Sequence, residues 1–356
     1  MRRAIRKMGE NVLAPSSDMS CQSVAAQTEI DAAPAAVWRA LTDPVELAQW
    51  FAPVADVFPG PGGRIHISWG GSFVADWLID AWQPPRRLRV TEIDALGGGR
   101  QSGDGAAVLP TAMAAASRPT HRAIEFLLTD LGSRTKLSLR HSGFGNNATP
   151  DFVAAVRRGW DFELRSLRHY LERHAGIRRD VVWLRRCSQL SAQTIWDRAI
   201  ALLTARDCGA PEQWREDEPL AIHLLHKDTR HGRVQICDPP HQLVLLVADL
   251  RDSLFRLKLA EESAGDVEVN IWLSTWGLER SILKQFERHW KPIVEELSDP
   301  TASPARPTGG GGGEDAAMKF PRQIAERSSA APVRLHRSSD PVERISCNAE
   351  EGCHGR

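Results

Sequence analysis

The sequence has almost no net charge, a single tyrosine and no long apolar run. Its 45 Lys and Arg residues balance 45 Asp and Glu residues, whereas a protein that grips nucleic acid is normally basic. No stretch approaches the roughly 18 consecutive apolar residues of a membrane helix, and the basic N-terminus lacks the apolar core of a signal peptide. We therefore expect a cytoplasmic protein with no nucleic-acid partner and no membrane span.

The motifs of metal sites and of common enzymes are also missing. Six cysteines are scattered without a CxxC pair, which argues against a zinc ribbon or a disulfide framework. Cys347, Cys353 and His354 have a spacing that matches no standard metal module. The chain has no nucleophile elbow and no HExxH motif. The glycines at 309–313 do not form a phosphate-binding loop, because no strand precedes them. We expect no metal, no cofactor and no catalytic residue.

Length and low-complexity segments suggest how the chain is divided. A chain of 356 residues exceeds a typical domain of about 100–200 residues, which favours two domains. Residues 1–22 and 299–356 are polar, and residues 97–120 are rich in Gly, Ala and Ser. Such segments bury too little apolar area to offset a backbone entropy of roughly 1–2 kcal/mol per residue. We expect disordered ends and, at 97–120, a flexible loop.

Between these segments, the first half predicts a sheet followed by a helix. A strand at 25–30 is followed by two short helices, the first starting near Pro34 and the second capped by Asp43. Alternation of apolar and polar residues then predicts strands at 64–69, 72–81, 84–93, 121–130 and 134–144. Apolar residues spaced by three or four predict a long helix from Thr149 to Gly176. Its inward positions are Phe152, Val156, Trp160, Leu164, Leu167 and Leu171. Its expected outward positions are Arg157, Arg158, Asp161, Glu163, Arg165, Arg168 and Glu172.

This order predicts an α+β fold in which a curved antiparallel sheet wraps around a long C-terminal helix, with a cavity where the two part. The second half repeats the plan, with a strand at 180–187, a helix at 191–204, five strands and a last helix that Pro292 should kink or end. We therefore expect two tandem copies, over 23–176 and 177–298, in contact with each other.

The first half also resembles a known family. The resemblance rests on IDAAPAAVWRALTDPVELAQWF (30–51), QPPRRLRV (83–90), RTKLSLRHSGF (134–144) and RRGWDFELRSLRHYL (157–171). These motifs are similar to the START-like (SRPBCC) superfamily, and within it to the branch related to the activator of the 90-kDa heat-shock protein ATPase (AHSA-type). The resemblance implies a helix-grip fold with a hydrophobic pocket under the long helix. It covers about 25–173, and the second half resembles the same fold by its pattern alone.

The interior faces of these elements supply the candidate ligand-binding residues. The predicted set is Trp50, Trp69, Phe73, Trp77, Arg122, Phe126, Leu139, His141 and Trp160. Each Trp can line a pocket or simply pack in the core, and His141 can orient a ligand or be a hydrogen-bonded core residue. Arg122 can point inward or reach solvent, whereas Glu92 and Asp94 are expected to be exposed.

Three functions follow as hypotheses. The first is a non-enzymatic binding protein that holds an apolar or aromatic small molecule under the long helix of the first domain. The second is a co-chaperone-like regulator that stimulates a 90-kDa heat-shock-type chaperone ATPase through its surface. The third and weaker one is a cyclase or hydratase of polyketide-like substrates that uses His141 and an acid. Fold alone does not choose among them.

Overall fold

The computed structural model describes residues 23–70, 73–93, 122–145, 148–204, 214–225, 228–261 and 265–301. Both sheets lie within one compact unit, Met1–Arg306. The segments predicted to be disordered or flexible, 1–22, 97–120 and nearly all of 299–356, lie outside the described residues, as do Asp94 and the C-terminal Cys347, Cys353 and His354. The boundary between two domains near residue 176 stays a prediction.

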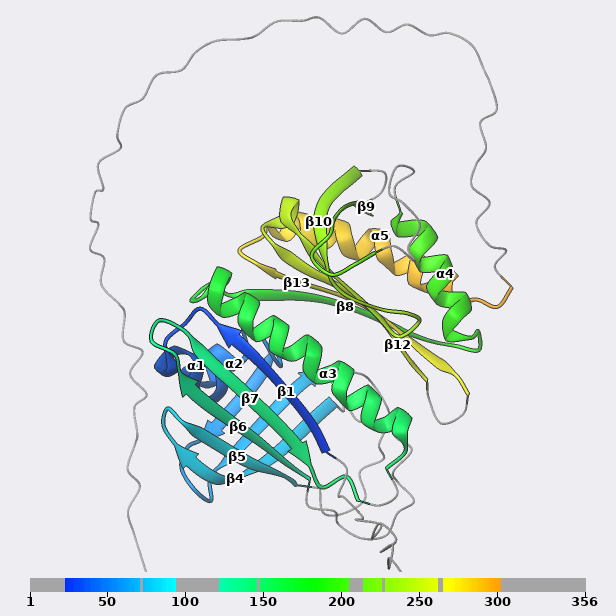
Figure 1. Ribbon diagram of the computed structural model, residues 1–356. Coiled ribbons are helices and arrows are strands. Elements are labelled where there is room, and N and C mark those ends of the chain that lie inside the picture. The colour runs from blue at the N-terminus through cyan, green and yellow to red at the C-terminus, as the bar shows by residue number, and fades with distance from the viewer. Residues whose placement is uncertain are drawn as a thin grey trace, which may run out of the picture. The chain divides into compact units, whose positions relative to one another are not determined.

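The first half forms a seven-stranded antiparallel sheet with one long helix across a face (Figure 1). The strands follow the spatial order β1-β7-β6-β5-β4-β3-β2. The elements are β1 (Ser23–Ile30), α1 (Pro34–Thr42), α2 (Pro44–Leu47), β2 (Val54–Phe58), β3 (Arg64–Gly70), β4 (Phe73–Gln83), β5 (Arg87–Ile93), β6 (Ala123–Asp130), β7 (Thr135–Ser142), α3 (Pro150–His169) and the π turn η2 (Tyr170–His174).

Local chemistry explains where these helices begin. Asp43 Oδ1 accepts hydrogen bonds from the backbone N–H groups of Val45 and Glu46, so Asp43 caps α2. Thr149 Oγ1 accepts from the N–H of Phe152 at 3.2 Å and caps α3 in the same way. A proline occupies the first turn of each helix, where no N–H is needed. These starts are as predicted, whereas strand β2 was missed because it lacks a fully buried face.

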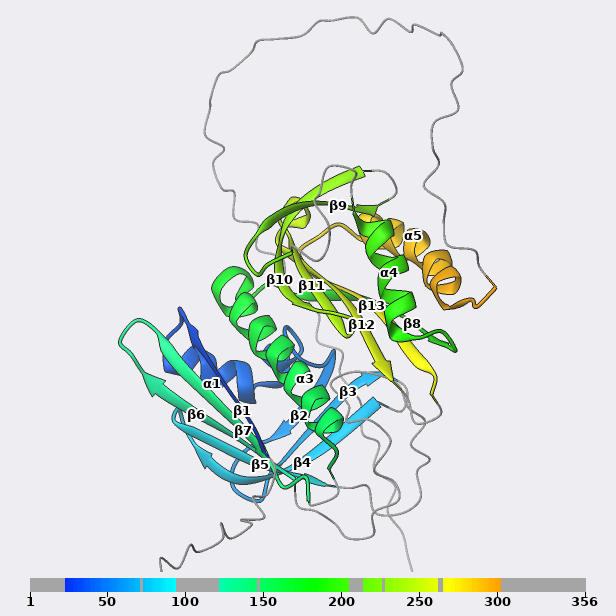
Figure 2. The ribbon, with the colours of Figure 1, turned by 45° about the vertical axis from the view of Figure 1, so that its right-hand side comes forward.

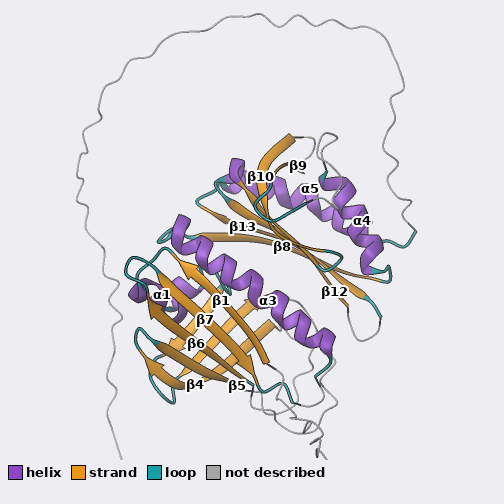
Figure 3. Ribbon diagram, viewed as in Figure 1, coloured by secondary structure: helices purple, strands orange, loops and turns teal. Residues whose placement is uncertain are grey.

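The second half forms a six-stranded antiparallel sheet with two helices on one face (Figure 2). Its spatial order is β8-β13-β12-β11-β10-β9, which corresponds to the order of the strands in the first sheet. The elements are β8 (Arg179–Ser188), α4 (Ala192–Leu203), β9 (Pro219–Leu225), β10 (Asp228–Asp238), β11 (Gln242–Val247), the 3-10 turn η4 (Ala248–Leu250), β12 (Ser253–Glu261), β13 (Val267–Trp276) and α5 (Arg280–Ser298). The α+β helix-grip architecture is confirmed, and each half pairs an antiparallel sheet with helices (Figure 3). That the halves are two tandem copies of this fold stays a prediction.

Of the two outcomes expected at Pro292, a kink or an end of the last helix, the end does not occur. Helix α5 continues through Pro292 to Ser298. Buried side chains hold it on both sides of the proline, because Trp290, Val294 and Leu297 all lie in the second core. The indole of Trp290 also donates a hydrogen bond of 2.9 Å to the carbonyl of Leu224. This packing offsets the backbone hydrogen bond that a proline removes.

Helix α3 is covered on more than one side, which the sequence pattern did not predict. Its residues Phe152, Val156, Trp160, Leu164 and Leu167 pack in the first core, as expected. Phe162, however, forms a separate apolar cluster with Ile236 and Val244 of the second sheet. Glu163, expected on the outer face, is only 4% exposed. The expectation of a single buried side is therefore wrong, because the second sheet covers the opposite face of α3.

Candidate ligand-binding site

The predicted site residues meet in one core between α3 and the first sheet. Trp50, Trp69, Trp77, Phe126, Leu139 and Trp160 are all buried members of the first core cluster, and His141 is 3% exposed beside them. They come from the end of α2, from strands β3, β4, β6 and β7, and from α3. The side chain of Phe73 lies outside the described residues. Whether these residues bind a ligand stays a prediction, but the fold does bring them together.

Trp50 holds the helices in place. Its indole Nε1 donates a hydrogen bond of 2.7 Å to the carbonyl of Ala40, and its own carbonyl accepts one of 3.0 Å from Ser166 Oγ on α3. The side chain is 1% exposed. Because both polar groups of Trp50 already have partners inside the protein, its ring is a structural anchor for the interior.

The centre of the interior is aromatic. The ring centroid of Phe51 lies 5.2 Å from that of Trp69 and 5.9 Å from that of Trp77. It lies 6.2 Å from the ring of Trp160 and nearly parallel to it. Phe126 meets the edge of Trp160 at 5.9 Å. Rings at these separations attract one another beyond the area they bury, so the interior presents flat apolar surfaces.

A polar network lies at one end of these rings. Trp160 Nε1 donates to His141 Nδ1 at 3.1 Å, and His141 Nε2 lies 3.4 Å from Glu92 Oε1. The other carboxylate oxygen of Glu92 pairs with Arg122 Nε at 2.6 Å. An indole only donates, so Nδ1 of His141 accepts and the ring's proton sits on Nε2, toward the carboxylate. The network thus has the order Arg122, Glu92, His141, Trp160.

The position of Glu92 in this network differs from the one expected from the sequence. Glu92 was expected to be exposed, but 15% of its side chain is accessible, and 18% of that of Arg122. Strand β5 does not fray at Glu92, because the backbone N–H of Glu92 still bonds to the carbonyl of Arg122 at 2.8 Å. The alternation of Leu88, Val90 and Glu92 along β5 pointed to this inward position.

The indole nitrogen of Trp77 is one of two buried nitrogen atoms of this interior that have no hydrogen-bond partner among the described residues, the other being His141 Nε2. Trp77 is 6% exposed, and its indole Nε1 makes no hydrogen bond within the described part of the chain. Leaving such a group unsatisfied costs about 1–3 kcal/mol. The donor belongs to β4 and sits in the ring cluster around Phe51.

A second, polar site lies where α3 meets the second sheet, and sequence reasoning missed it. Phe162 and Glu163 of α3, Phe51 and Trp69 of the first half, and residues of three strands of the second sheet line one pocket. The strand residues are Arg179 and Trp183 (β8), Arg256 and Lys258 (β12), and Asn270 and Trp272 (β13). The centre of a water molecule can occupy about 20 Å³ inside this pocket. This space is enough for a water molecule or a small ion.

Burial controls the charges of this pocket. It raises the pKa of Glu163 to about 7, against the opposing attraction of Arg256, Arg179 and Lys258. Burial also lowers the pKa of both guanidinium groups to about 10, which leaves them charged near neutral pH. Arg179 donates to the carbonyl of Phe51 at 2.8 Å and Arg256 to Gln242 Oε1 at 3.1 Å. The guanidinium of Arg256 also lies 3.8 Å from the ring centroid of Phe162.

The sequence signal for this site was ambiguous. Arg256 and Lys258 alternate with apolar residues along β12, and Asn270 and Trp272 alternate along β13. Such alternation is typical of a strand with one face in water. Here the polar face is covered as well, since every residue of β13 is buried.

No group of three or more His, Cys, Asp or Glu side chains that could hold a metal occurs among the described residues. No helix in the described part of the chain is long and apolar enough to cross a membrane.

Proteins similar to this chain are found among solved structures. No curated protein matches the sequence. A solved structure from Mesorhizobium loti is 26% identical and covers 43% of this chain and 98% of its own, with a TM-score of 0.33. The Aha1 dimer from Colwellia psychrerythraea is 21% identical and covers 44% of this chain and 99% of its own, with a TM-score of 0.33. BexL, a di-domain ARO/CYC of the BE-7585A biosynthetic pathway, is 15% identical and covers 80% of this chain and 100% of its own, again with a TM-score of 0.33.

A family model gives the more specific result. The family described as "Activator of Hsp90 ATPase homolog 1-like protein" matches residues 31–172. This span runs from the start of α1 to the π turn after α3, so it contains the aromatic interior and the Glu92–His141 network. It also includes nearly all of the segments on which the sequence resemblance rests. Residues 31–172 of this chain therefore match the AHSA-type family that the sequence motifs resemble.

Proposed function

We propose that the first half is a non-enzymatic binding protein for an aromatic small molecule that carries a hydrogen-bond acceptor. The guest lies between α3 and the sheet, among the rings around Phe51. The observation that carries this proposal is the indole N–H of Trp77, which is buried among aromatic rings without a partner. A carbonyl or phenol oxygen on the guest would satisfy this donor and recover its desolvation cost.

The surroundings of Trp77 favour an aromatic guest over an aliphatic one. The ring centroids of Trp69 and Trp160 lie 5.2 Å and 6.2 Å from that of Phe51, and the three rings offer apolar faces and edges. At the far end, His141 Nδ1 accepts from Trp160 and Glu92 pairs with Arg122, while His141 Nε2 lies 3.4 Å from Glu92 without a hydrogen bond. A guest therefore gains most by stacking on rings and accepting one hydrogen bond. The described rings are in contact, so binding requires some of them to rotate, and the guest must replace the ring contacts it breaks.

The test uses two small molecules of nearly equal shape, tetralin and 1-tetralone, which differ by one carbonyl oxygen. Thermal denaturation of the full chain is followed with each molecule at equal concentration. We expect 1-tetralone to raise Tm more than tetralin, and Trp77→Phe to remove that difference while leaving the tetralin effect. Trp82→Phe is the control, because Trp82 is half-buried and packs against Trp38. No shift with either molecule would contradict the proposal.

A second candidate function, regulation of a chaperone, is favoured by an exposed apolar surface on the first sheet. Val54 and Phe58 of β2 are 54% and 68% exposed, and Val74 and Leu78 of β4 are 50% and 40% exposed. The register brings Val54 and Val74 to either side of Ser68, and Phe58 and Leu78 to either side of Arg64. Exposed apolar residues grouped in this way are typical of a protein contact.

This candidate has its own test. The ATPase rate of the cell's 90-kDa heat-shock-type chaperone is measured with and without the full chain. Stimulation that Phe58→Ser abolishes, and that Trp77→Phe leaves unchanged, would favour regulation over small-molecule binding. An unchanged ATPase rate would exclude this role.

A further inference from the structure

We propose that the pocket between α3 and the second sheet is a binding site for a small carboxylate, held by Arg179 and Arg256 and opposed by Glu163. Phe51 and Trp69 line both this pocket and the aromatic interior, but neither Trp77 nor the Glu92–His141 network lines it, so the two proposals are tested at different residues. Its lining residues come from both halves of the chain, so it exists only in the full molecule.

The first argument is the excess of positive charge in a buried space. Arg179 is 8% exposed and Arg256 is 6% exposed, and Lys258 lines the same pocket. The carboxylate that faces them is Glu163. Glu268, the next acid on β13, is already engaged by Arg185 at 2.9 Å and by the side-chain amide of Asn270 at 3.0 Å. Buried cations that outnumber their counter-charges are costly unless an anion joins them.

The second argument is an unsatisfied donor that belongs to the pocket wall. Nε of Arg256 is buried and has no hydrogen-bond partner in the described part of the structure. The same guanidinium uses Nη2 to donate to Gln242, and its central carbon lies 3.8 Å from the ring centroid of Phe162, so the group is held by two contacts. A fixed guanidinium edge is the geometry that carboxylates bind best, through paired N–H groups.

The third argument is the separation between Glu163 and the two arginines. Among the described residues, no salt bridge within 4.0 Å joins Glu163 to Arg179 or Arg256, although all three line the pocket. The pocket that they line has room for about one water molecule. A bound carboxylate would contact the guanidinium groups that Glu163 does not reach.

Glu163 makes this binding depend on pH. The charged groups that face it are Arg256 and Lys258 from β12 and Arg179 from β8. When Glu163 is ionised, it repels an incoming carboxylate and shares its cations. When Glu163 is protonated, the cations are left to the ligand. Because burial raises the pKa of Glu163 to about 7, binding should strengthen as pH falls from 8 to 6.

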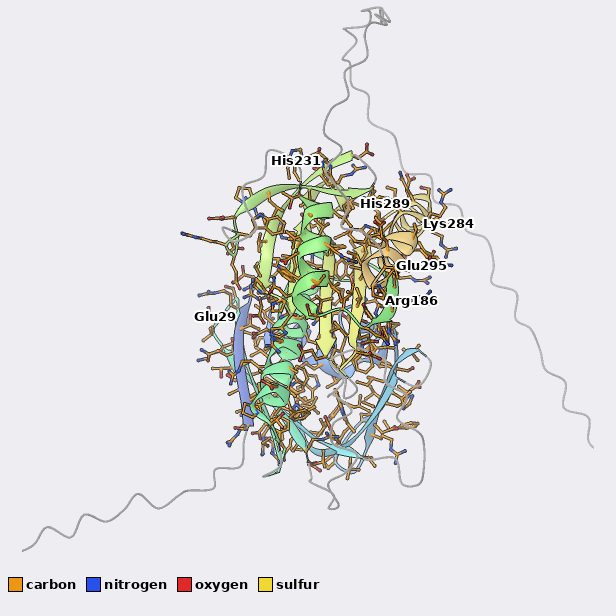
Figure 4. All side chains as sticks on the ribbon, turned by 90° about the vertical axis from the view of Figure 1, so that its right-hand side faces the viewer. Glu29, Arg186, His231, Lys284, His289 and Glu295 are labelled. Carbon is orange, nitrogen blue, oxygen red and sulfur yellow. The ribbon has the colours of Figure 1, made fainter. Side chains whose placement is uncertain are left out.

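The test is a thermal-shift titration of the full chain with sodium acetate at pH 6 and pH 8, with ionic strength held constant by sodium sulfate. We expect a saturable rise in Tm and an affinity up to about tenfold higher at pH 6, because a carboxyl with a pKa of about 7 is about ten times more often protonated at pH 6 than at pH 8. Glu163→Gln should bind at both pH values as the unmodified chain does at pH 6. Glu295→Gln is the matched control, because Glu295 lies on the surface of α5 (Figure 4) with half of its side chain exposed.

Arg256→Gln should abolish the acetate effect. If that variant does not fold, the comparison of Glu163→Gln with Glu295→Gln still decides the question. The proposal is overturned if acetate does not raise Tm at pH 6, if Arg256→Gln responds like the unmodified chain, or if Glu163→Gln keeps the pH dependence. A sodium chloride titration that matches acetate would overturn the assignment to a carboxylate.

Discussion

The indole of Trp160 donates a hydrogen bond of 3.1 Å to Nδ1 of His141, which ties the middle of α3 to strand β7. Both side chains are buried, at 6% and 3% exposure. The bond therefore forms in a low-dielectric interior, where leaving either partner unsatisfied is costly. It also sets the tautomer of His141 and so directs the N–H of Nε2 toward Glu92.

Replacing the acceptor of this bond should destabilise the fold to a degree that depends on the substitute. His141→Ala leaves the indole N–H of Trp160 unpaired and opens a cavity, so we expect the free energy of unfolding to fall by about 2–4 kcal/mol. His141→Gln supplies a side-chain oxygen that can accept the same bond and should lose about half as much. Urea denaturation at pH 7 measures both variants. Equal losses would mean that the hydrogen bond contributes nothing.

The pH dependence of stability should report a pair of histidines at the end of α3 and in the π turn η2 that follows it. Nε2 of His169 lies 2.7 Å from the carbonyl of Asp252 and 3.2 Å from Nε2 of His174, which stacks on Trp276 at 4.5 Å. Burial lowers the pKa of His169 from 6.5 to about 4 and also lowers the pKa of His174. The unfolded chain therefore binds more protons than the folded chain between about pH 4 and 6.5.

The sign follows from that difference. Stability rises with pH wherever the unfolded state binds more protons, so the contribution of these histidines is complete above about pH 6.5 and is lost as pH falls toward 4. We expect a loss on the order of 2–3 kcal/mol. Urea denaturation from pH 4 to 7 measures it, and His169→Asn should flatten the curve. His231→Asn is the control, because His231 is exposed (Figure 4). Matching curves for the two variants would contradict the assignment.

The capping residue of α3 allows a simple check of its local energetics. Thr149 Oγ1 accepts the N–H of Phe152, so Thr149→Ala should lower the free energy of unfolding by about 0.5–2 kcal/mol. Ser281→Ala is a suitable control, since Ser281 lies in the first turn of α5 but its hydroxyl bonds only to the side chain of Glu279. A smaller effect at Thr149 than at Ser281 would contradict the capping role.

The periodicity of apolar residues was sufficient to predict which side chains face the interior in most of the first half. Thr135, Leu137, Leu139 and His141 were predicted to share a face, and all four are buried. The spacing of Phe152, Val156 and Trp160 predicted the inner side of α3 because a helix turns through 3.6 residues. These patterns depend on local geometry, which the sequence encodes directly.

The polar pocket could not be predicted in the same way. Alternating polar residues such as Arg256 and Asn270 give the same pattern whether their face meets water or another layer of the protein. The burial of Glu163 depends on the second sheet covering α3, and periodicity does not reveal which surfaces meet. Glu92 was misassigned for a related reason, since its burial depends on pairing with Arg122 from the next strand.

Substitutions of two neighbouring arginines, Arg178 and Arg179, would show whether contact between the halves stabilises the protein. Arg179 is buried and donates to the carbonyl of Phe51 at 2.8 Å, while its backbone N–H donates to Gln49 Oε1 at 2.7 Å. Arg178 precedes it with 78% of its side chain exposed. Arg179→Met leaves a buried carbonyl unpaired and removes a counter-charge from Glu163, so the free energy of unfolding should fall by about 2–4 kcal/mol. Arg178→Met should change it by less than about 0.5 kcal/mol.

Because burial also raises the pKa of Glu163, the loss in Arg179→Met should be larger at pH 8 than at pH 6, where the carboxyl is mostly protonated. Denaturation of both variants at the two pH values checks this, and a pH-independent difference would mean that Arg179 acts through its hydrogen bonds alone.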